Sequence, residues 1–289
     1  MAKTREIKKR IKAVRNIQRI TKTMQMIATA RFKSSLDRAL ATKPYSEKVR
    51  ELVGELASSA GNIEHPLFKA PAEATGKELV LVLTSNRGLC GAYNSNVLRA
   101  AMAHIKGLAG EAVVEVVGKK GAAFFRFAGI TVAQQHKEFG DKPRYEDVEA
   151  LAQSYMDEFT AGKFDRVTVV YMRFISAGKQ RATVDQLLPL ARPAGDGRGQ
   201  AGGAQQYDFS PDAKSLLAEL LPITVKAALY QAFNDAAVSE HVARMVAMKA
   251  ATDNAGKLGK SLKQKFNRAR QTQITTELNE IIGGAAGLG

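Results

Sequence analysis

The chain has 289 residues and a formal net charge of +15, from 43 Lys and Arg against 28 Asp and Glu. This length allows one or two domains, and a hydrophobic fraction of 45% supplies a sizeable core and argues against disorder. The single cysteine excludes an internal disulfide, and because the sequence has neither an eighteen-residue apolar run nor an N-terminal h-region, we expect no membrane span and no secretion signal.

Residues 1–60 are predicted to form a long, basic, amphipathic helix. Its apolar residues recur at helical spacing and then resume after a three-residue step, a slip that would locally overwind a coiled coil. They are Ile7, Ile11 and Val14, followed by Ile17, Ile20, Met24 and Ile27.

The middle of the chain, residues 76–190, alternates between strand-like and helix-like periods. Such alternation requires crossover connections and a mainly parallel sheet covered on both faces, so we predict a doubly wound, Rossmann-like α/β domain. The expected strands are 78–84, 112–117, 131–135, 166–174 and 181–188, and the expected helices are 95–105, 119–127 and 146–160.

A glycine-rich stretch over residues 193–210 predicts a flexible loop, and residues 211–289 predict a second long helix. A continuous helix of this length reaches on the order of 100 Å. Pro222 lies within it, so the helix either kinks there, which we favour, or begins after Leu221. Its apolar stripe consists of Leu229, Phe233, Ala236, Val242, Met245, Ala255, Leu258, Leu262 and Phe266.

The two terminal helices are natural partners for each other, because an amphipathic helix gains most of its stability by covering its apolar face. We expect an antiparallel two-stranded coiled coil from opposite ends of the chain. Small or flexible residues would fill its seam, namely Met24, Ala28, Ala30 and Met248.

The positive charge is concentrated on these two helices. Residues 1–33 hold eleven Lys or Arg and one acid, residues 240–270 hold eight against two, and the middle is close to neutral. A surface of this kind attracts an acidic partner, which can be nucleic acid, anionic lipid or acidic protein loops. The alternative for any single residue is a solvated helix face.

Two glycine turns in the α/β region invite comparison with nucleotide sites. SNRGLCG at 85–91 lacks the G-x-G-x-x-G fingerprint and the Walker ending, and GKKG at 118–121 has no second glycine upstream and no Ser or Thr after the lysine. We interpret both as tight packing turns. The four histidines are scattered, so no catalytic or metal-binding constellation is predicted, and Cys90 is interpreted as a small packing residue.

Four sequence blocks resemble the γ subunits of F-type ATP synthases, in that family's order and over nearly the whole chain. They are REIKKRIKAVRNIQRITKTMQMIATARF, SNRGLCGAYNSN, SEHVARMVAMKAATDNAG and NRARQTQITTELNEIIGGAA. The last block matches the family pattern through Ile274, Thr275, Glu277, Glu280, Gly284 and Ala285.

This resemblance implies a central-stalk rotor that is not itself catalytic and needs no cofactor. Its partners would be the α and β subunits of the catalytic ring, the ε subunit and the membrane c-ring, with no nucleic acid. It would couple ion flow through the c-ring to conformational cycling of the β subunits, from a peripheral position on the cytoplasmic side of a bacterial inner membrane.

The same resemblance assigns contact residues. Contacts with β subunits are expected at Lys22, Met24, Arg87, Cys90, Arg244, Arg270, Gln271, Thr275 and Glu277. The uncharged end of the chain, with Ile281 and Ile282, would be a bearing tip, and Tyr207, Asp208 and Phe209 would form part of a foot facing the c-ring.

Two other functions remain open from the residues alone. A basic helical hairpin could bind nucleic acid through phosphate contacts, although its aromatic residues are few and not interleaved with the basic stripe. A nucleotide-dependent enzyme built on residues 76–190 would need ligand-binding motifs that the sequence lacks.

Overall fold

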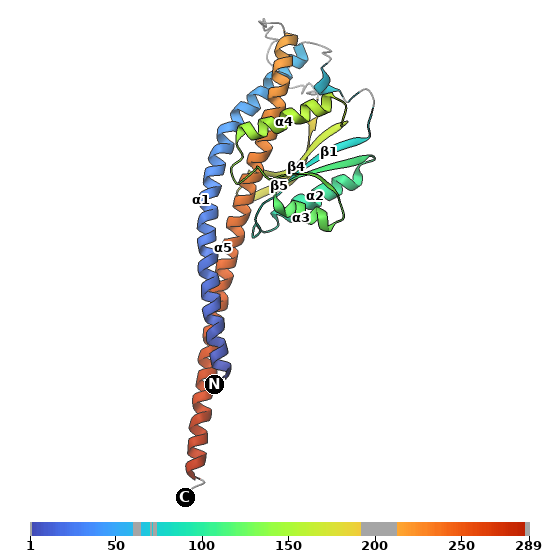
Figure 1. Ribbon diagram of the computed structural model, residues 1–289. Helices are drawn as coiled ribbons and strands as arrows, with labels where there is room; N and C mark the ends of the chain where they lie inside the picture. The colour runs from blue at the N-terminus through green and yellow to red at the C-terminus, as the bar shows by residue number, and fades with distance from the viewer. Residues whose placement is uncertain (1, 60–64, 70, 72–73, 192–212, 287–289) are drawn as a thin grey trace. The chain divides into compact units, whose positions relative to one another are not determined.

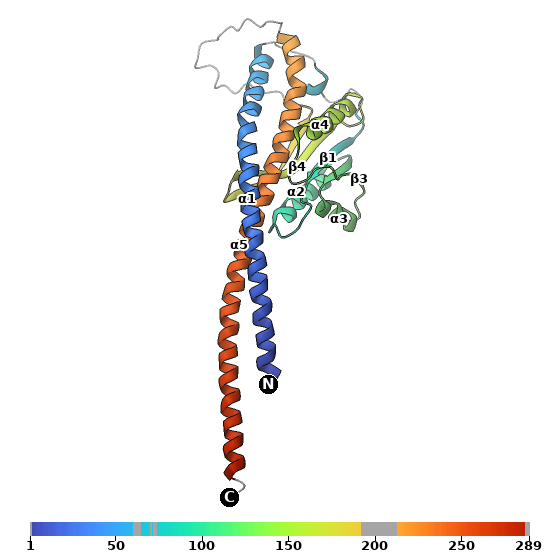
Figure 2. The ribbon, with the colours of Figure 1, turned by 60° about the vertical axis from the view of Figure 1, so that its left-hand side comes forward.

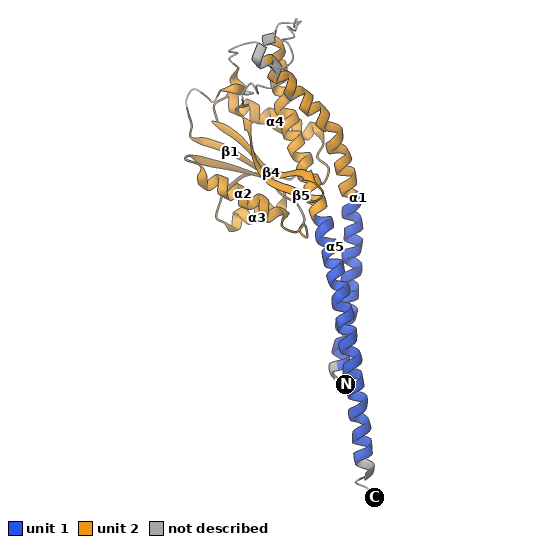
Figure 3. Cartoon of the chain, turned by 180° about the vertical axis from the view of Figure 1, so that it is seen from behind, with its two compact units in different colours: residues 1–30, 244–289 blue, residues 31–243 orange. Residues whose placement is uncertain are grey.

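The computed structural model describes residues 2–59, 65–69, 71, 74–191 and 213–286. The chain divides into two compact units, shown blue and orange in Figure 3: unit 1 is Met1–Ala30 with Arg244–Gly289, and unit 2 is Arg31–Ala243. Helices α1 (Ala2–Ser59) and α5 (Ala213–Ala286) each contribute to both units. The predicted loop 193–210, with the foot residues Tyr207, Asp208 and Phe209, lies outside the described residues.

Both long helices contain a proline. Helix α5 begins at Ala213 and continues through Pro222, so the alternative start after Leu221 is wrong, and α1 continues through Pro44. An interior proline costs a helix about 3 kcal/mol. Burial offsets this cost in α5, because Leu221 and Val225 on either side of Pro222 are fully buried.

Unit 1 is an antiparallel pair of helices, as predicted (Figure 2). Thr4 donates to Gln273 over 3.1 Å, and Thr252 donates to Thr21 over 2.8 Å, so the two helices run in opposite directions. The covered positions follow unbroken steps of four and three, the spacing of a coiled-coil seam. This series is 7, 11, 14, 18, 21, 25 and 28 on α1, and 248, 252, 255, 259, 262, 266, 269 and 273 on α5, and it is flanked by other partly covered residues such as Met24, Ala251 and Gly256.

The predicted slip in the α1 stripe is therefore wrong. Ile17, Ile20 and Ile27 are 52%, 56% and 50% exposed, while Gln18 and Thr21 occupy the seam with Ala28. The seam keeps the phase set by Ile7, Ile11 and Val14, because a shift would rotate every following residue out of the interface. Leu258 and Ala30, also predicted at the seam, are likewise exposed.

We expect the substitution Gly259→Ala to stabilise unit 1. A Cβ atom at Gly259 would lie 3.9 Å from Val14 Cγ1, an ordinary contact, and alanine in a helix interior is favoured over glycine by about 0.5–1 kcal/mol. Urea denaturation of the full chain, followed by circular dichroism at 222 nm, measures the gain.

Gly256→Ala is the matched control for that substitution. Its Cβ would lie 3.0 Å from Gln18 Nε2, so the Gln18 side chain must move and the gain should be smaller. A loss of stability in Gly259→Ala would show that the helices approach more closely there than the structure indicates.

Unit 2 is built on a five-stranded sheet in the order β3-β2-β1-β4-β5 (Figure 1). The first four strands in this order are parallel, and β5 pairs antiparallel with β4 through a short turn. The prediction of a mainly parallel sheet is confirmed. The strands are β1 (Lys77–Leu83), β2 (Glu111–Val117), β3 (Val132–His136), β4 (Arg166–Ser176) and β5 (Lys179–Leu188).

Helices cover both faces of this sheet. On one face, α2 (Tyr93–Gly107) and α3 (Lys119–Phe127) pack over Val80 and Val82. On the other, α4 (Tyr145–Thr160) and the unit 2 part of α5 pack over Leu79 and Leu81. Strand β1 is thus buried on both faces, which explains its unbroken run of apolar residues. A short 3₁₀ helix, η1 (Pro66–Phe68), precedes β1.

Candidate functional site

The outer surface of unit 1 is strongly basic. Unit 1 carries 17 Lys and Arg against four acids, so the acids are too few to neutralise it. Arg10 pairs with Glu6 at 2.7 Å. Most of the other cations are exposed on both helices, including Lys8, Lys9, Lys12, Arg15, Arg19 and Lys22 on α1 and Lys257, Lys260, Lys263, Lys265, Arg268 and Arg270 on α5.

An apolar row runs along the same outer surface. Ile17, Ile20, Met24 and Ile27 are spaced at three or four residues, so they lie on one side of α1. The isoleucines are half exposed, and Met24 is partly covered. We call these four residues the outer row. Since the seam is already closed by other residues, the outer row is available to a partner.

The structure places most of the predicted contact residues of unit 1 on the surface. Lys22, Arg270, Gln271, Thr275 and Glu277 are exposed. Gln273 donates to Glu277 over 2.8 Å, and the Thr275 hydroxyl donates to the Gln271 carbonyl over 3.0 Å. Arg244 differs, because it is only 8% exposed.

The end of α5 extends past its partner helix within unit 1. Thr4, near the start of α1, faces Gln273, and the following α5 residues through Gly283 are exposed. Ile281 and Ile282, the predicted bearing tip, are 69% and 58% exposed. A single helix gains little from leaving such residues in water, so this end is suited to a partner that covers it.

Unit 2 presents a tight loop between β1 and α2. Arg87 and Leu89 are exposed there, and Leu89 has φ of +61°, an uncommon conformation for a non-glycine residue. Cys90 is 2% exposed, and Asn94 Nδ2 lies 3.2 Å from its sulfur, so Cys90 supports the loop from inside. The sequence did not reveal Leu89, because backbone conformation is not visible in residue type.

The two glycine turns lie together at the carboxyl edge of the sheet, and three backbone amides of the second turn, at the start of α3, are occupied. Lys119 N donates to Asn86 Oδ1, Lys120 N to the Ser85 carbonyl, and Gly121 N to Thr84 Oγ1. A helix N-terminus binds an anion through free N–H groups. The start of α3 therefore offers no ready phosphate site, which supports the interpretation of residues 118–121 as a packing turn.

The aromatic residues of the long helices also bear on the nucleic-acid alternative. Phe32 packs against Phe174, Phe233 against Phe139, and Tyr230 against Tyr145. Rings that stack bases must present an open face. These three are engaged within unit 2 and Phe266 lies in the seam of unit 1, so among the described aromatic residues of the two helices only Tyr45 is exposed, which weakens that alternative.

Two further features concern the described part of the chain. It contains no group of three or more His, Cys, Asp or Glu side chains that would hold a metal ion. In the described residues one helical stretch, within α5, is long and apolar enough to cross a membrane, by length and composition only. The core helix of a soluble protein can have the same length and composition, and α5 contributes Leu217, Leu221 and Leu229 to the core of unit 2.

Comparison with known proteins gives consistent matches over the full length. A family model described as ATP synthase matches residues 3–288. An ATP synthase gamma chain from Rhodopirellula baltica is 45% identical over 295 residues, covering 100% of this chain and 99% of that protein. One from Leptospira biflexa is 38% identical, covering 99% of each.

Solved structures show a similar fold. A chain of the Euglena gracilis mitochondrial ATP synthase rotor superposes with a TM-score of 0.65 at 21% identity, covering 94% of this chain and 99% of that chain. A chain from another structure of that complex, which includes F1 and the c-ring, gives 0.67 at 20% identity, covering 99% and 95%. These matches confirm the predicted fold of long paired terminal helices with a central sheet.

Proposed function

Because the chain belongs to the ATP synthase gamma chain family, we propose that it couples ion flow through a membrane c-ring to conformational cycling of catalytic β subunits. As the central-stalk rotor it would contribute no catalytic residue. We expect it on the cytoplasmic side of a bacterial inner membrane, as a peripheral part of the complex.

One observation carries this proposal: the seam of unit 1 is closed, yet its outer surface is both basic and apolar. A coiled coil that only held the chain together would need neither an exposed isoleucine row nor so many unneutralised cations. Together they are suited to a surrounding protein sleeve with acidic loops and apolar patches.

A rotor changes a remote site only through contacts that differ between the states of that site. Driving a two-state subunit from mostly one form to mostly the other requires about 5.5 kcal/mol of differential interaction. Cations such as Lys22 and Arg270 would supply part of this through acidic β loops, and the outer row would supply apolar contacts.

The other predicted contacts have distinct roles in this proposal. Arg87, held outward by the loop that Cys90 supports, would meet a β subunit, whereas buried Arg244 would act by positioning α5. Gln271, Thr275 and Glu277 would form hydrogen bonds with the ring, and the tip with Ile281 and Ile282 would turn inside an apolar collar. The ε subunit and the c-ring would bind unit 2 and the foot.

The first experiment is native mass spectrometry of the full chain mixed with α and β subunits from the same source, with ATP hydrolysis followed in parallel. We expect one copy per ring of alternating α and β subunits and faster turnover than the ring alone. A chain that fails to associate would contradict the proposal, and salt-sensitive RNA binding would then favour the nucleic-acid alternative.

The outer row allows a sharper test. Ile20→Asp combined with Ile27→Asp should weaken association with the ring at least roughly tenfold, because burying two unpaired carboxylates is costly at an apolar interface. Both positions are exposed, so the fold of the free chain should be retained. Titration of the ring with each variant, read by ATP hydrolysis, measures the effect.

Phe127→Asp serves as a control, because it places one carboxylate on an exposed apolar position and can be compared with Ile20→Asp alone as well as with the double substitution. Phe127 is 91% exposed at the end of α3 in unit 2, away from the outer row in the sequence and on another unit. Its substitution should alter association less than twofold. Equal effects of the two changes would mean that the outer row has no specific role.

A further inference from the structure

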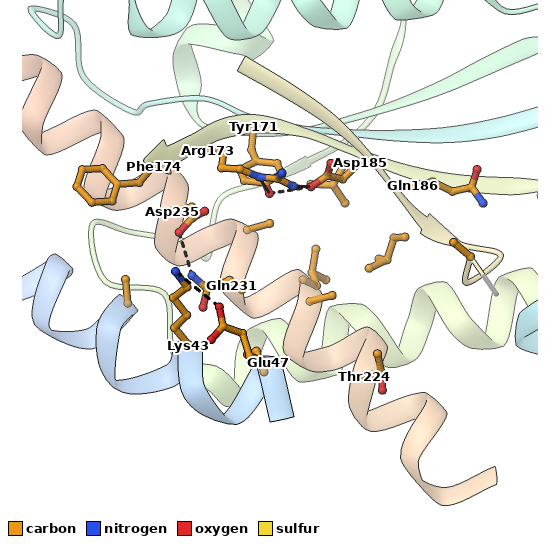
Figure 4. Close-up of a pocket in the computed structure, with 18 of the residues that line it drawn as sticks. Lys43, Glu47, Tyr171, Arg173, Phe174, Asp185, Gln186, Thr224, Gln231 and Asp235 are labelled. Atoms are coloured by element: carbon orange, nitrogen blue, oxygen red, sulfur yellow. Dashed lines mark hydrogen bonds and ion pairs between the residues drawn. The ribbon is translucent and has the colours of Figure 1, made fainter. Parts of the chain in front are cut away.

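Unit 2 contains a cavity of about 790 Å³ between α1, the β4–β5 pair and α5 (Figure 4). Its walls are largely apolar and include Leu36 and Leu40 of α1, Val169 and Leu187 of the sheet, and Leu229 of α5. This volume lies in the range of small-molecule sites, which combine apolar walls with a few polar groups.

Most charged groups on the cavity wall already have partners. Arg173 of β4 pairs with Asp185 of β5, and the Tyr171 hydroxyl donates to Asp185 over 2.8 Å while accepting from Arg173 Nε over 3.1 Å. On α1, Lys43 pairs with Glu47 at 3.6 Å. A ligand would gain little from breaking either pair.

Asp235 of α5 is the exception. Its carboxylate accepts from Gln231 Nε2 over 2.9 Å and from the Phe174 backbone, and within the described residues no Lys or Arg lies within ion-pair distance. Figure 4 shows it beside Gln231, on the side of the cavity that faces α1. Burial raises the pKa of Asp235 to about 6, although Gln231 and the charges of Arg173 and Lys43 act in the opposite direction.

The charge of the wall is correspondingly unbalanced. Five charged side chains line the cavity: two cations, Lys43 and Arg173, and three carboxylates, Glu47, Asp185 and Asp235. An apolar neutral ligand would desolvate Asp235 further, and an anion would add repulsion. A ligand with one positive charge would balance the set and pair with the partly buried carboxylate.

We propose that this cavity binds a hydrophobic monocation, whose ammonium group pairs with Asp235 and whose apolar body lies against the leucines of α1, β5 and α5. Asp235 and Gln231 form the polar end of the cavity, where the ammonium group binds, and the apolar walls contact the rest of the ligand.

Isothermal titration calorimetry on the full chain at pH 7.5 tests this, with dodecylammonium, dodecanoate and dodecanol as probes below their micelle concentrations. We expect dodecylammonium to bind at least tenfold more tightly than dodecanoate. The comparison is stringent because the net charge of +15 favours the anion at any nonspecific surface site. At pH 5, dodecylammonium binding should weaken about tenfold, because Asp235 becomes protonated.

Substitutions distinguish the role of the Asp235 carboxylate from the role of the cavity volume. Asp235→Asn should remove the preference for the cation, whereas Glu47→Gln, which removes an exposed carboxylate at the same wall, should change affinity less than threefold. Ala228→Phe, which fills the cavity from α5, should reduce binding of all three probes. Absence of binding, equal affinity for the three probes, or an unchanged preference in Asp235→Asn would overturn the proposal.

Discussion

Replacing Gly118 with alanine is expected to lower the free energy of unfolding of unit 2 by about 3–5 kcal/mol. Gly118 precedes α3 with φ of +96° and ψ of 142°, a region that L side chains rarely adopt. A Cβ atom there would lie 2.3 Å from the Thr84 carbonyl oxygen, which belongs to backbone and cannot rotate away. Urea denaturation monitored by tyrosine fluorescence measures the loss.

Gly129→Ala is the matched control for the Gly118 substitution. Gly129 also has positive φ, +72°, but its added Cβ would meet no atom within 4 Å. The substitution should therefore lower the free energy of unfolding only through the strain of the backbone conformation, by about 1 kcal/mol. Similar losses at both positions would show that the close packing of Gly118 against Thr84 contributes nothing to stability.

The second large effect is expected at Glu115, which is buried at the centre of a polar cluster. Its carboxylate accepts from the Tyr155 hydroxyl over 2.7 Å and lies 2.8 Å from His136 Nε2, while His136 Nδ1 lies 2.9 Å from Glu138. Glu115→Ala leaves two buried polar groups without this partner, so unit 2 should lose about 3–5 kcal/mol. Chemical denaturation at pH 6.5 measures the difference.

Glu138→Ala is the control in the same cluster. The Glu138 side chain is 52% exposed, so water can replace it at His136 and the loss should stay below about 1 kcal/mol. If Glu115→Ala cost no more than Glu138→Ala, the buried cluster would not stabilise the fold.

The same cluster makes stability depend on pH. Burial alone would lower the pKa of His136, but hydrogen bonds and charges from Glu115 and Glu138 outweigh it and raise that pKa above 6.5. Protonated His136 therefore contributes fully to the free energy of unfolding below pH 6.5. This contribution declines as the pH rises through the pKa that His136 has in the folded state. Glu115→Ala should flatten this decline, which denaturation at several pH values between 6 and 9 would reveal.

The elements of unit 2 follow closely from the sequence. The predicted helix 119–127 has the same bounds in the structure, and each strand is displaced by at most a few residues. Apolar residues in this region follow the period of two in strands and of 3.6 in helices, because each strand or helix buries a defined face in the core of unit 2. The antiparallel direction of β5 is set by the short turn after Ser176, which is too short for a crossover.

The candidate site was only partly visible in the sequence. The basic surface could be located from charge alone, because Lys and Arg remain exposed unless paired. The predicted contacts Lys22, Arg270, Gln271, Thr275 and Glu277 are exposed, whereas Cys90 and Arg244 are buried. Residue type cannot distinguish these cases, since burial depends on which helix face or loop side meets a neighbour.

The pairing of two long terminal helices follows from the amino-acid sequence, because both ends of the chain have apolar residues at period 3.6 and each apolar face needs a cover. Which face of α1 lies inside, by contrast, depends on how the two helices pack against each other. Judged by hydrophobicity, Ile17 and Ile20 outrank Gln18 and Thr21, yet the isoleucines are exposed and the polar residues are in the seam. The register fixed elsewhere along the helix pair, together with the Thr21–Thr252 hydrogen bond, outweighs local hydrophobicity and leaves the outer row free for a partner.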